Sequence, residues 1–127
     1  MIFGAWTNGE YVKIEIESDK LYIKEKMIYL ENDVVSVFFS KTKWFLLYNY
    51  KKSGKVFPNN IFTYDYSGNF LYKVGDIINA KNLCFTGISP YYNEDTQDEY
   101  IVCGTFDCVN YIFDAANGSF LCRKQSK

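Results

Sequence analysis

The stretch that determines the fold is Tyr111-Ile112-Phe113-Asp114-Ala115-Ala116-Asn117-Gly118-Ser119-Phe120-Leu121. It reads as an apolar strand, a polar turn and an apolar return strand. Asp can hydrogen-bond turn amides through its side chain, and Gly supplies the positive φ that a tight hairpin needs. The start of the return strand recurs at intervals of 50 residues, as Lys20-Leu21-Tyr22, Phe70-Leu71-Tyr72 and Phe120-Leu121-Cys122. A period of this length is typical of stacked units that cannot bury their apolar faces alone.

Strand-like segments fill the intervals between these repeats. From Val12 to Glu17 apolar and charged residues alternate, which indicates a strand with one face in water. The other segments are β-branched and aromatic runs bounded by turn residues. The predicted strands are residues 11–17, 21–24, 34–39, 44–50, 61–65, 70–74, 83–88, 100–104, 109–114 and 119–124. Residues 24–32 are predicted to hold at most a short helical turn.

Grouped by the 50-residue period, these strands form two sets of four after an earlier set of about three. Four antiparallel strands in a unit of about 40 to 50 residues are typical of a propeller blade. We therefore expect residues 1–127 to form one all-β antiparallel domain, a partial propeller-like stack of about three blades with three or four strands each. Such a stack cannot close, so its ends need cover. A homodimer that completes a six-bladed ring and a single twisted β-sandwich stay open as alternatives.

The segment from Gly104 to Leu121 resembles a blade of the quinoprotein-like β-propeller family. In that family a Gly-Thr-x-Asp turn is followed by Tyr-x-x-Asp-Ala-x-x-Gly and a hydrophobic return strand. The residues that match are Gly104, Thr105, Asp107, Tyr111, Asp114, Ala115 and Gly118, with a looser copy at Asp65, Gly68, Phe70 and Leu71. Two residues depart from the pattern: Cys122 stands where such blades usually carry Trp, and Cys108 replaces a small turn residue. The resemblance implies a fold but no cofactor, because pyrroloquinoline quinone sites take residues from a complete ring.

The chemical inventory argues against catalysis. The chain has no His, which removes the commonest general base and the Ser-His and Cys-His nucleophile systems. Its four cysteines form no C-x-x-C pair and are expected to be reduced and buried, so we predict no catalytic residue, metal or cofactor. Asp65 and Asp114 are the obvious acid pair for a glycosidase, but their equivalent repeat positions favour a shared turn-capping role. A carbohydrate-binding or carboxylate-dependent carbohydrate-active module stays the alternative.

The most distinctive surface segment is a predicted long loop from Ser89 to Tyr100. It places four acids within six residues, beside three tyrosines. Long loops without secondary structure are often functional, Tyr is enriched at interface hot spots, and an acidic cluster would steer a basic partner. We therefore predict a protein-binding site formed by Tyr91, Tyr92, Glu94, Asp95, Asp98, Glu99 and Tyr100. A solvated hairpin loop is the alternative.

Charge elsewhere gives weaker indications. The formal net charge of −1 provides no general attraction to nucleic acid or to an anionic membrane. Lysines at positions 41, 43, 51, 52 and 55 adjoin aromatic residues that could stack single-stranded bases, although lysines beside strands commonly protect sheet edges. The chain begins without a leader-like pattern, and no apolar run approaches the roughly 18 residues of a spanning helix, so a cytoplasmic location is expected.

Together these features predict a small non-catalytic module that binds another protein with a basic surface. In outline the chain is similar to bacterial immunity proteins, which neutralise a cognate toxin by covering its active site. If the partner is a toxin nuclease domain, the acids of the 89–100 segment would mimic phosphate charge. A homodimeric structural scaffold is a further alternative.

Overall fold

The computed structural model of the chain describes residues 1–125, most of which lie in antiparallel strands. The first sheet contains β1 (Ile2–Thr7), β2 (Glu10–Glu17), β3 (Lys20–Ile23) and β4 (Lys26–Tyr29). The second contains β5 (Val34–Phe39), β6 (Lys43–Tyr48), β9 (Ile61–Asp65) and β10 (Phe70–Lys73), and a separate hairpin is formed by β7 (Lys51–Lys52) and β8 (Lys55–Val56). After the helix α1 (Val74–Ile77), the third sheet contains β11 (Phe85–Asn93), β12 (Asp98–Thr105), β13 (Val109–Asp114) and β14 (Phe120–Gln125).

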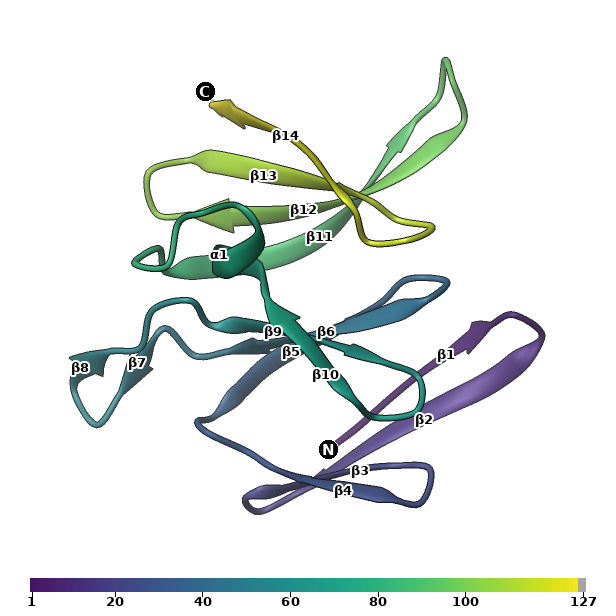
Figure 1. Cartoon of the computed structure of the whole chain (residues 1–127), viewed down its shortest axis with the longest axis vertical. Coiled ribbons are helices and arrows are strands. Elements are labelled where there is room, and N and C mark those ends of the chain that lie inside the picture. The colour runs from purple at the N-terminus through teal and green to yellow at the C-terminus, as the bar shows by residue number, and fades with distance from the viewer. Residues whose placement is uncertain (126–127) are drawn as a thin grey trace.

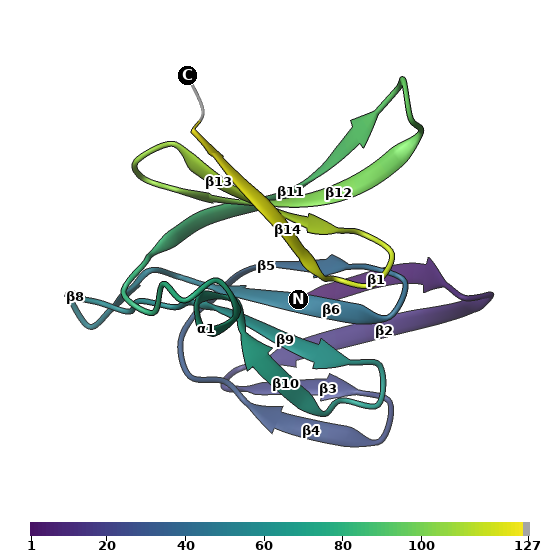
Figure 2. The ribbon, with the colours of Figure 1, turned by 45° about the horizontal axis from the view of Figure 1, so that its top comes forward.

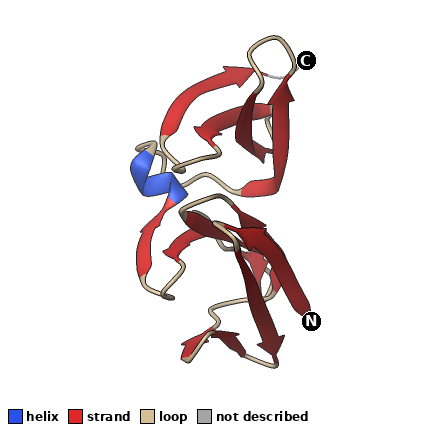
Figure 3. Ribbon diagram, turned by 90° about the vertical axis from the view of Figure 1, so that its right-hand side faces the viewer, coloured by secondary structure: helices blue, strands red, loops and turns tan. Residues whose placement is uncertain are grey.

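The three four-stranded sheets follow one another along the long axis of the molecule (Figure 1). Neighbouring strands in the first and third sheets are consecutive in the chain, while the β7–β8 hairpin interrupts the second sheet between β6 and β9. The predicted all-β antiparallel fold is therefore confirmed. The helix α1, which contains four residues, lies at the junction of the second and third sheets (Figure 3). It is the only helix in residues 1–125 and is far too short to cross a membrane.

The second sheet is covered on both faces. Trp44, Leu46 and Tyr48 of β6 belong to a core cluster shared with the first sheet, whereas Phe45 and Leu47 belong to a cluster shared with the third. All five side chains are buried. This double burial explains why β6 shows no alternation of apolar and polar residues, since neither of its faces meets water.

Burial also affects ionisation in the first of these two core clusters. The Tyr48 hydroxyl lies under the packed rings and accepts a hydrogen bond from the Glu31 amide (3.3 Å). Burial raises the pKa of Tyr48 to about 12, because removal from water disfavours the phenolate. The ring therefore stays neutral and contributes to the core as an apolar group over the ordinary pH range.

A buried amide joins the second sheet to the third. The side chain of Asn60 is fully buried and donates to the carbonyls of Tyr48 (2.7 Å) and Phe85 (2.9 Å), while its carbonyl oxygen accepts from the Phe85 amide (2.8 Å). The preceding residue, Asn59, accepts from Gly75 in α1 (2.7 Å) through its side chain. These contacts satisfy backbone groups of β6 and β11 that cannot reach a strand partner there.

Local predictions differ from the structure at four points. The 24–32 segment contains strand β4 rather than a helical turn, and the first sheet gains a fourth strand, β1, that precedes the predicted ones. Lys51 and Lys52, which follow the predicted strand 44–50, form the additional strand β7. The cysteines are free, as predicted, but only Cys103 is fully buried; Cys108 and Cys122 are exposed because one lies in a turn and the other on the edge strand β14.

The Asn60 contacts lead to a stability prediction. Asn60→Ala leaves two buried carbonyls and one buried amide without partners, so the free energy of unfolding should fall by about 2 to 4 kcal/mol. Urea denaturation followed by circular dichroism measures the change. The matched control is Asn82→Ala, because Asn82 is exposed and its substitution should change stability by less than about 0.5 kcal/mol. Equal effects of the two substitutions would contradict the assigned role.

Candidate protein-binding groove and hairpin arm

The segment predicted as a long loop is a β-hairpin. β11 and β12 pair from Phe85 opposite Thr105 to Asn93 opposite Asp98, and only the residues between these ends form the turn. β11 is an edge strand, so Pro90 is tolerated although it cannot donate a backbone hydrogen bond. The turn is stabilised by the Asn93 side chain, which accepts from the amides of Asp95 (3.0 Å) and Thr96 (3.2 Å). The prediction of an unstructured loop is therefore wrong.

The end of this hairpin projects past the rest of the third sheet. The pairing of β12 with β13 ends at Tyr100 opposite Asp114, whereas the pairing with β11 continues through Tyr92 opposite Glu99. We call residues 91–99 the hairpin arm. Beyond Tyr100 the arm has no strand partner from β13, so it extends as a two-stranded hairpin.

A groove of about 760 Å³ lies between the arm and the first two sheets. β1, β5 and β11 are the first strands and edge strands of their sheets, and β5 contacts both of the others (Figure 2). The groove opens where these three strands end. Its lining comprises residues 5–8 and 38–41 together with Pro90, Tyr92, Gln97, Asp98, Glu99, Tyr100, Asp114, Ala115 and Ala116.

The structure brings together four of the seven predicted binding residues. Tyr92, Asp98, Glu99 and Tyr100 line the groove. The other three do not: Tyr91 lies on the opposite face from its neighbour Tyr92 and packs on Tyr100 (ring centroids 6.0 Å apart), while Glu94 and Asp95 lie at the turn. The sequence could not indicate Phe38, because it reads as one of several core residues of a β-branched and aromatic strand.

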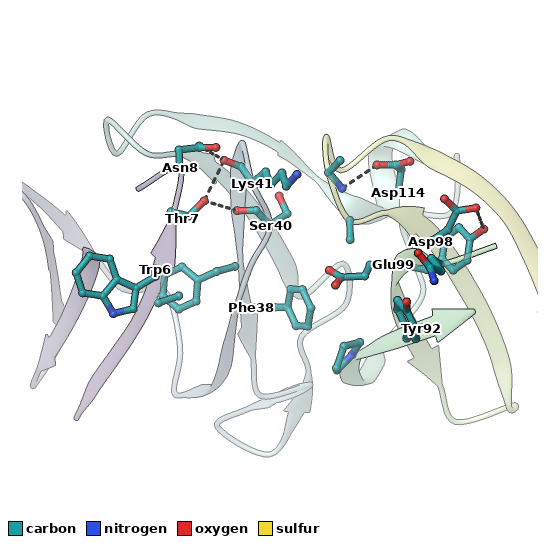
Figure 4. A pocket seen from close by; sticks show the side chains of 17 residues that line it. Trp6, Thr7, Asn8, Phe38, Ser40, Lys41, Tyr92, Asp98, Glu99 and Asp114 are labelled. Atoms are coloured by element: carbon teal, nitrogen blue, oxygen red, sulfur yellow. Dashed lines mark hydrogen bonds between the residues drawn. The ribbon is translucent and has the colours of Figure 1, made fainter. Parts of the chain in front are cut away.

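Glu99 occupies the centre of the groove. Its carboxylate points into the open space, with Phe38 on one side and Tyr92 on the other (Figure 4). Within residues 1–125 the Glu99 side chain forms no hydrogen bond or ion pair, since the two ion pairs of that region are Lys13–Glu15 and Lys24–Glu10. An exposed carboxylate flanked by an aromatic ring on each side is suited to a cationic group.

The backbone of Glu99 is held in place by a relay of hydrogen bonds through three turns. Its carbonyl accepts from the Ala115 amide (3.1 Å), and the Ala115 carbonyl accepts from the Lys41 amide (3.4 Å). The Lys41 carbonyl in turn accepts from the side chains of Thr7 (3.2 Å) and Asn8 (2.6 Å). All three sheets therefore take part in fixing the groove, so its shape is set before any partner binds.

Acidic groups predominate in the groove. Its lining includes three acids, Asp98, Glu99 and Asp114, and one basic residue, Lys41. The Tyr100 hydroxyl donates to Asp98 (3.3 Å). Partial burial and then the negative charge of Asp98 raise the pKa of Tyr100, so this hydroxyl remains a neutral donor. The resulting surface favours a cationic partner.

Asp65 and Asp114 serve as turn caps, as the repeat predicted. The Asp65 carboxylate accepts from the amides of Ser67 and Asn69 (both 2.9 Å), and that of Asp114 accepts from the amides of Ala116 (2.7 Å) and Asn117 (3.2 Å). Gly68 and Gly118 close the two turns with φ values of 86° and 74°. Burial alone would raise the pKa of Asp65, but the hydrogen bonds from Asn69 and Ser67 lower it below its usual value.

Two other sequence features give no site. In the described residues no group of three His, Cys, Asp or Glu side chains is arranged to hold a metal ion. The aromatic residues beside the basic hairpin are covered by its own lysines: Lys51 lies over Tyr50 (5.9 Å) and Lys52 over Phe57 (5.7 Å). These cation–π contacts leave the rings less open to stacked bases.

The chain was compared with known families, proteins and structures. No protein-family profile matches the chain, and neither the curated proteins nor the solved structures contain a significant match.

The turn caps generate a second prediction. Asp65→Ala and Asp114→Ala should each lower the free energy of unfolding by about 1 to 2 kcal/mol at pH 7, because each removes an acceptor for two turn amides. The pKa of Asp65 is lowered in the folded protein, so its contribution is present above the unfolded pKa near 4 and is lost as the pH falls further. The cost of Asp65→Ala should therefore shrink in acid.

Urea titrations between pH 3 and 7 test this prediction. Asp95→Ala is the control, because Asp95 is an exposed carboxylate at the arm turn whose side chain makes no hydrogen bond within the described chain. A pH-independent cost for Asp65→Ala, or a cost as large for Asp95→Ala, would refute the turn-cap assignment.

Proposed function

We propose that the chain is a non-catalytic protein-binding module whose groove receives a basic side chain of a partner protein. The observation that carries this proposal is Glu99, an unpaired carboxylate between Phe38 and Tyr92 in a groove fixed by three sheets. Glu99 would pair with a lysine or arginine head group, and the two rings would flank its apolar stem. Asp98 and Asp114 add negative charge around the same site.

The arm extends this surface toward the partner. Glu94 and Asp95 lie at its turn, and Asp98 and Glu99 lie on opposite faces of β12 at its base, so the arm carries four acids on an element that projects from the body of the protein. Such a concentration of negative charge would accelerate encounter with a basic partner. Tyr91 and Tyr92, about half exposed at 54% and 50%, supply contact area on opposite faces of the arm.

We propose more specifically that the partner is a toxin nuclease domain and that this chain is its immunity protein. A nuclease cleft is basic because it binds phosphates, so the acidic arm would enter it as a phosphate mimic. The support is the combination of projecting geometry and acidic charge, in a chain without histidine.

Carbohydrate binding is the second candidate, and a separate observation favours it. The side chain of Trp6 is 76% exposed and points away from the centre of the groove, beside Tyr11 (ring centroids 5.4 Å apart). Exposed rings of this kind can stack on sugar faces. Saturable binding of a sugar that Trp6→Ala abolishes, with no binding of basic peptides, would favour this candidate over the first.

The main proposal predicts weak, salt-sensitive binding of an arginine-rich octapeptide by the whole chain. Glu99→Gln should weaken the affinity about tenfold, because a charge-assisted hydrogen bond is lost while the shape is kept. Tyr92→Ala should weaken it as well. Isothermal titration calorimetry at low and at physiological salt provides the measurement.

The control for the peptide experiment is Glu25→Gln, an exposed carboxylate in the β3–β4 turn far from the groove in the fold. It changes the net charge by the same amount as Glu99→Gln, so it should lower the affinity for the peptide only through the change in the protein's overall electrostatic field. If both variants bind the peptide equally well, the groove is not the binding site.

The finer proposal predicts that the gene directly upstream encodes a protein with a toxic C-terminal domain. Coexpression of this chain with that domain should restore growth. The variant E94Q/D95N/D98N/E99Q should lose protection while keeping the wild-type circular dichroism spectrum, because its four carboxylates lie on the exposed arm. Failure of the wild-type chain to protect would remove toxin neutralisation and leave the peptide result unaffected.

A further inference from the structure

One strand that lines the groove has an edge without a strand partner. β5 lies at the end of the second sheet and pairs only with β6 within residues 1–125. It contacts both β1 and β11, the edge strands of the other two sheets. Phe38 and Phe39 of β5, and Ser40 directly after it, line the groove. The end of β5 therefore offers a free edge beside the groove that holds Glu99.

The register of the β5–β6 hairpin determines which main-chain groups of β5 are free. The Ser40 amide donates to the Lys43 carbonyl (2.8 Å) across a two-residue turn, and hydrogen-bonded pairs recur at every second residue of an antiparallel ladder. The main chain of Phe38 is therefore directed toward β6. The N–H and C=O groups of Val37 and Phe39 are directed away from β6, so an added strand could bind to them.

The other two edge strands at the groove are less suited to an added strand. On β11 the groove is lined by Pro90, which has no N–H to donate and is a residue that commonly protects a sheet edge. β1 belongs to the first sheet, whereas Glu99 belongs to the third, and β5 is the strand that contacts the edges of both sheets. β5 is thus the edge that combines free amides with proximity to Glu99.

The two faces of β5 point to different sheets. Val37 and Phe39 pack against the core cluster shared with the first sheet, whereas Phe38 packs against the cluster shared with the third. Phe38 also lies beside the Glu99 carboxylate (Figure 4). Residues directly opposite each other in paired strands share a face of the sheet. A residue placed opposite Phe38 would therefore direct its side chain toward Glu99.

We infer that the partner enters the groove as an extended segment that pairs antiparallel with β5 and directs alternate basic residues toward Glu99. This inference rests on the proposed function of the groove and specifies the form in which the basic side chain arrives. In strand addition of this kind, main-chain hydrogen bonds provide affinity and alternate side chains provide selectivity. The antiparallel direction is that of β6 and β9 in the same sheet, and it is slightly the more stable one per residue.

The charges around β5 match such a segment. The third sheet contributes the acids Asp98, Glu99 and Asp114 to the groove, while Lys41 lies in the turn beyond the end of β5. The lining residues from β1 carry no charge. A segment in which basic and neutral residues alternate would therefore place its basic side chains toward the acids and its neutral side chains toward the first sheet.

Strand geometry separates the amides of this segment into two sets. Residues opposite Val37 and Phe39 exchange main-chain hydrogen bonds with them, whereas a residue opposite Phe38 directs its N–H away from β5. The neutral residues would thus bind through their main chain, and the basic residues through their side chains. A methyl group on an amide nitrogen removes that donor, so it distinguishes the two sets.

Peptides with methylated amides test the inference. The probe is an octapeptide of alternating arginine and threonine with blocked ends, titrated calorimetrically into the full chain at low salt. Methylation of the threonine amides should weaken binding about tenfold or more, because hydrogen bonds to β5 are lost. A slip by one residue could not rescue it, since the arginines would then face away from Glu99. Methylation of the arginine amides, with the same added mass and the same charge, should change affinity by less than about twofold.

A variant of the protein tests the same edge. Val37→Pro removes an N–H that β6 does not use, and Pro is tolerated on an edge strand at such a position. It should weaken binding of the unmethylated peptide about tenfold. The control is Ile2→Pro at the exposed start of β1, outside the groove lining, where the N–H also points away from its strand partner because the neighbouring Met1 bonds to Ile16. Circular dichroism confirms that both variants are folded.

Three results would overturn the inference: equal effects of the two methylation patterns, loss of binding on methylation of the arginine amides alone, or full affinity in Val37→Pro. If Val37→Pro does not fold, the two methylated peptides decide the outcome. Where the unmethylated peptide binds and Glu99→Gln weakens it, any of the three results leaves the proposed function standing and removes only the strand pairing. No binding of the unmethylated peptide would refute the proposed function together with this inference.

Discussion

The double burial of the second sheet is the constraint on which the rest of the structure depends. β6 contributes Trp44, Leu46 and Tyr48 to one core cluster and Phe45 and Leu47 to the other, so it has no side that could face water. Burial of each such side chain contributes about 1.5 to 3 kcal/mol, and five consecutive residues of this strand are buried. The first and third sheets cannot serve as independent domains, because each has its main apolar face against the second.

The parts of the fold that the sequence could predict are those set by local chemistry. Asp65 with Gly68 and Asp114 with Gly118 have the same side-chain hydrogen bonds and the same left-handed glycine in the structure, so the 50-residue period correctly located both turns. Two other hairpins have a stronger sequence signal than the 50-residue period. Asn8-Gly9 and Ser53-Gly54 both have positive φ at each residue, which is the type I′ geometry that joins two strands directly. These two dipeptides are the sequence signals for β1 and for the β7–β8 hairpin.

Features that depend on contacts between sheets could not be predicted. Asn60 reads as a loop residue after Pro58, yet it is fully buried because the end of β6 and the start of β11 both need a partner there. The groove also depends on contacts between sheets. Its lining comes from five separated segments, and only the stacking of the sheets brings Phe38 to Glu99. Four of the seven predicted binding residues line the groove, and strand alternation, which the expected loop did not include, places Tyr91 and Tyr92 on opposite faces.

The groove follows from the same stacking that buries β6. Because each sheet begins with its edge strand, stacking places β1, β5 and β11 in sequence and brings the turns at their ends within hydrogen-bonding range of one another. A relay from Asn8 through Lys41 and Ala115 then fixes the backbone of Glu99. The stacked sheets thus fix the main chain of Glu99, so this residue loses no main-chain conformational freedom when a partner binds to its carboxylate. A site of this kind favours a cationic side chain over a neutral one by its charge, and over a free cation by the two flanking rings, which a bare ion would leave uncovered.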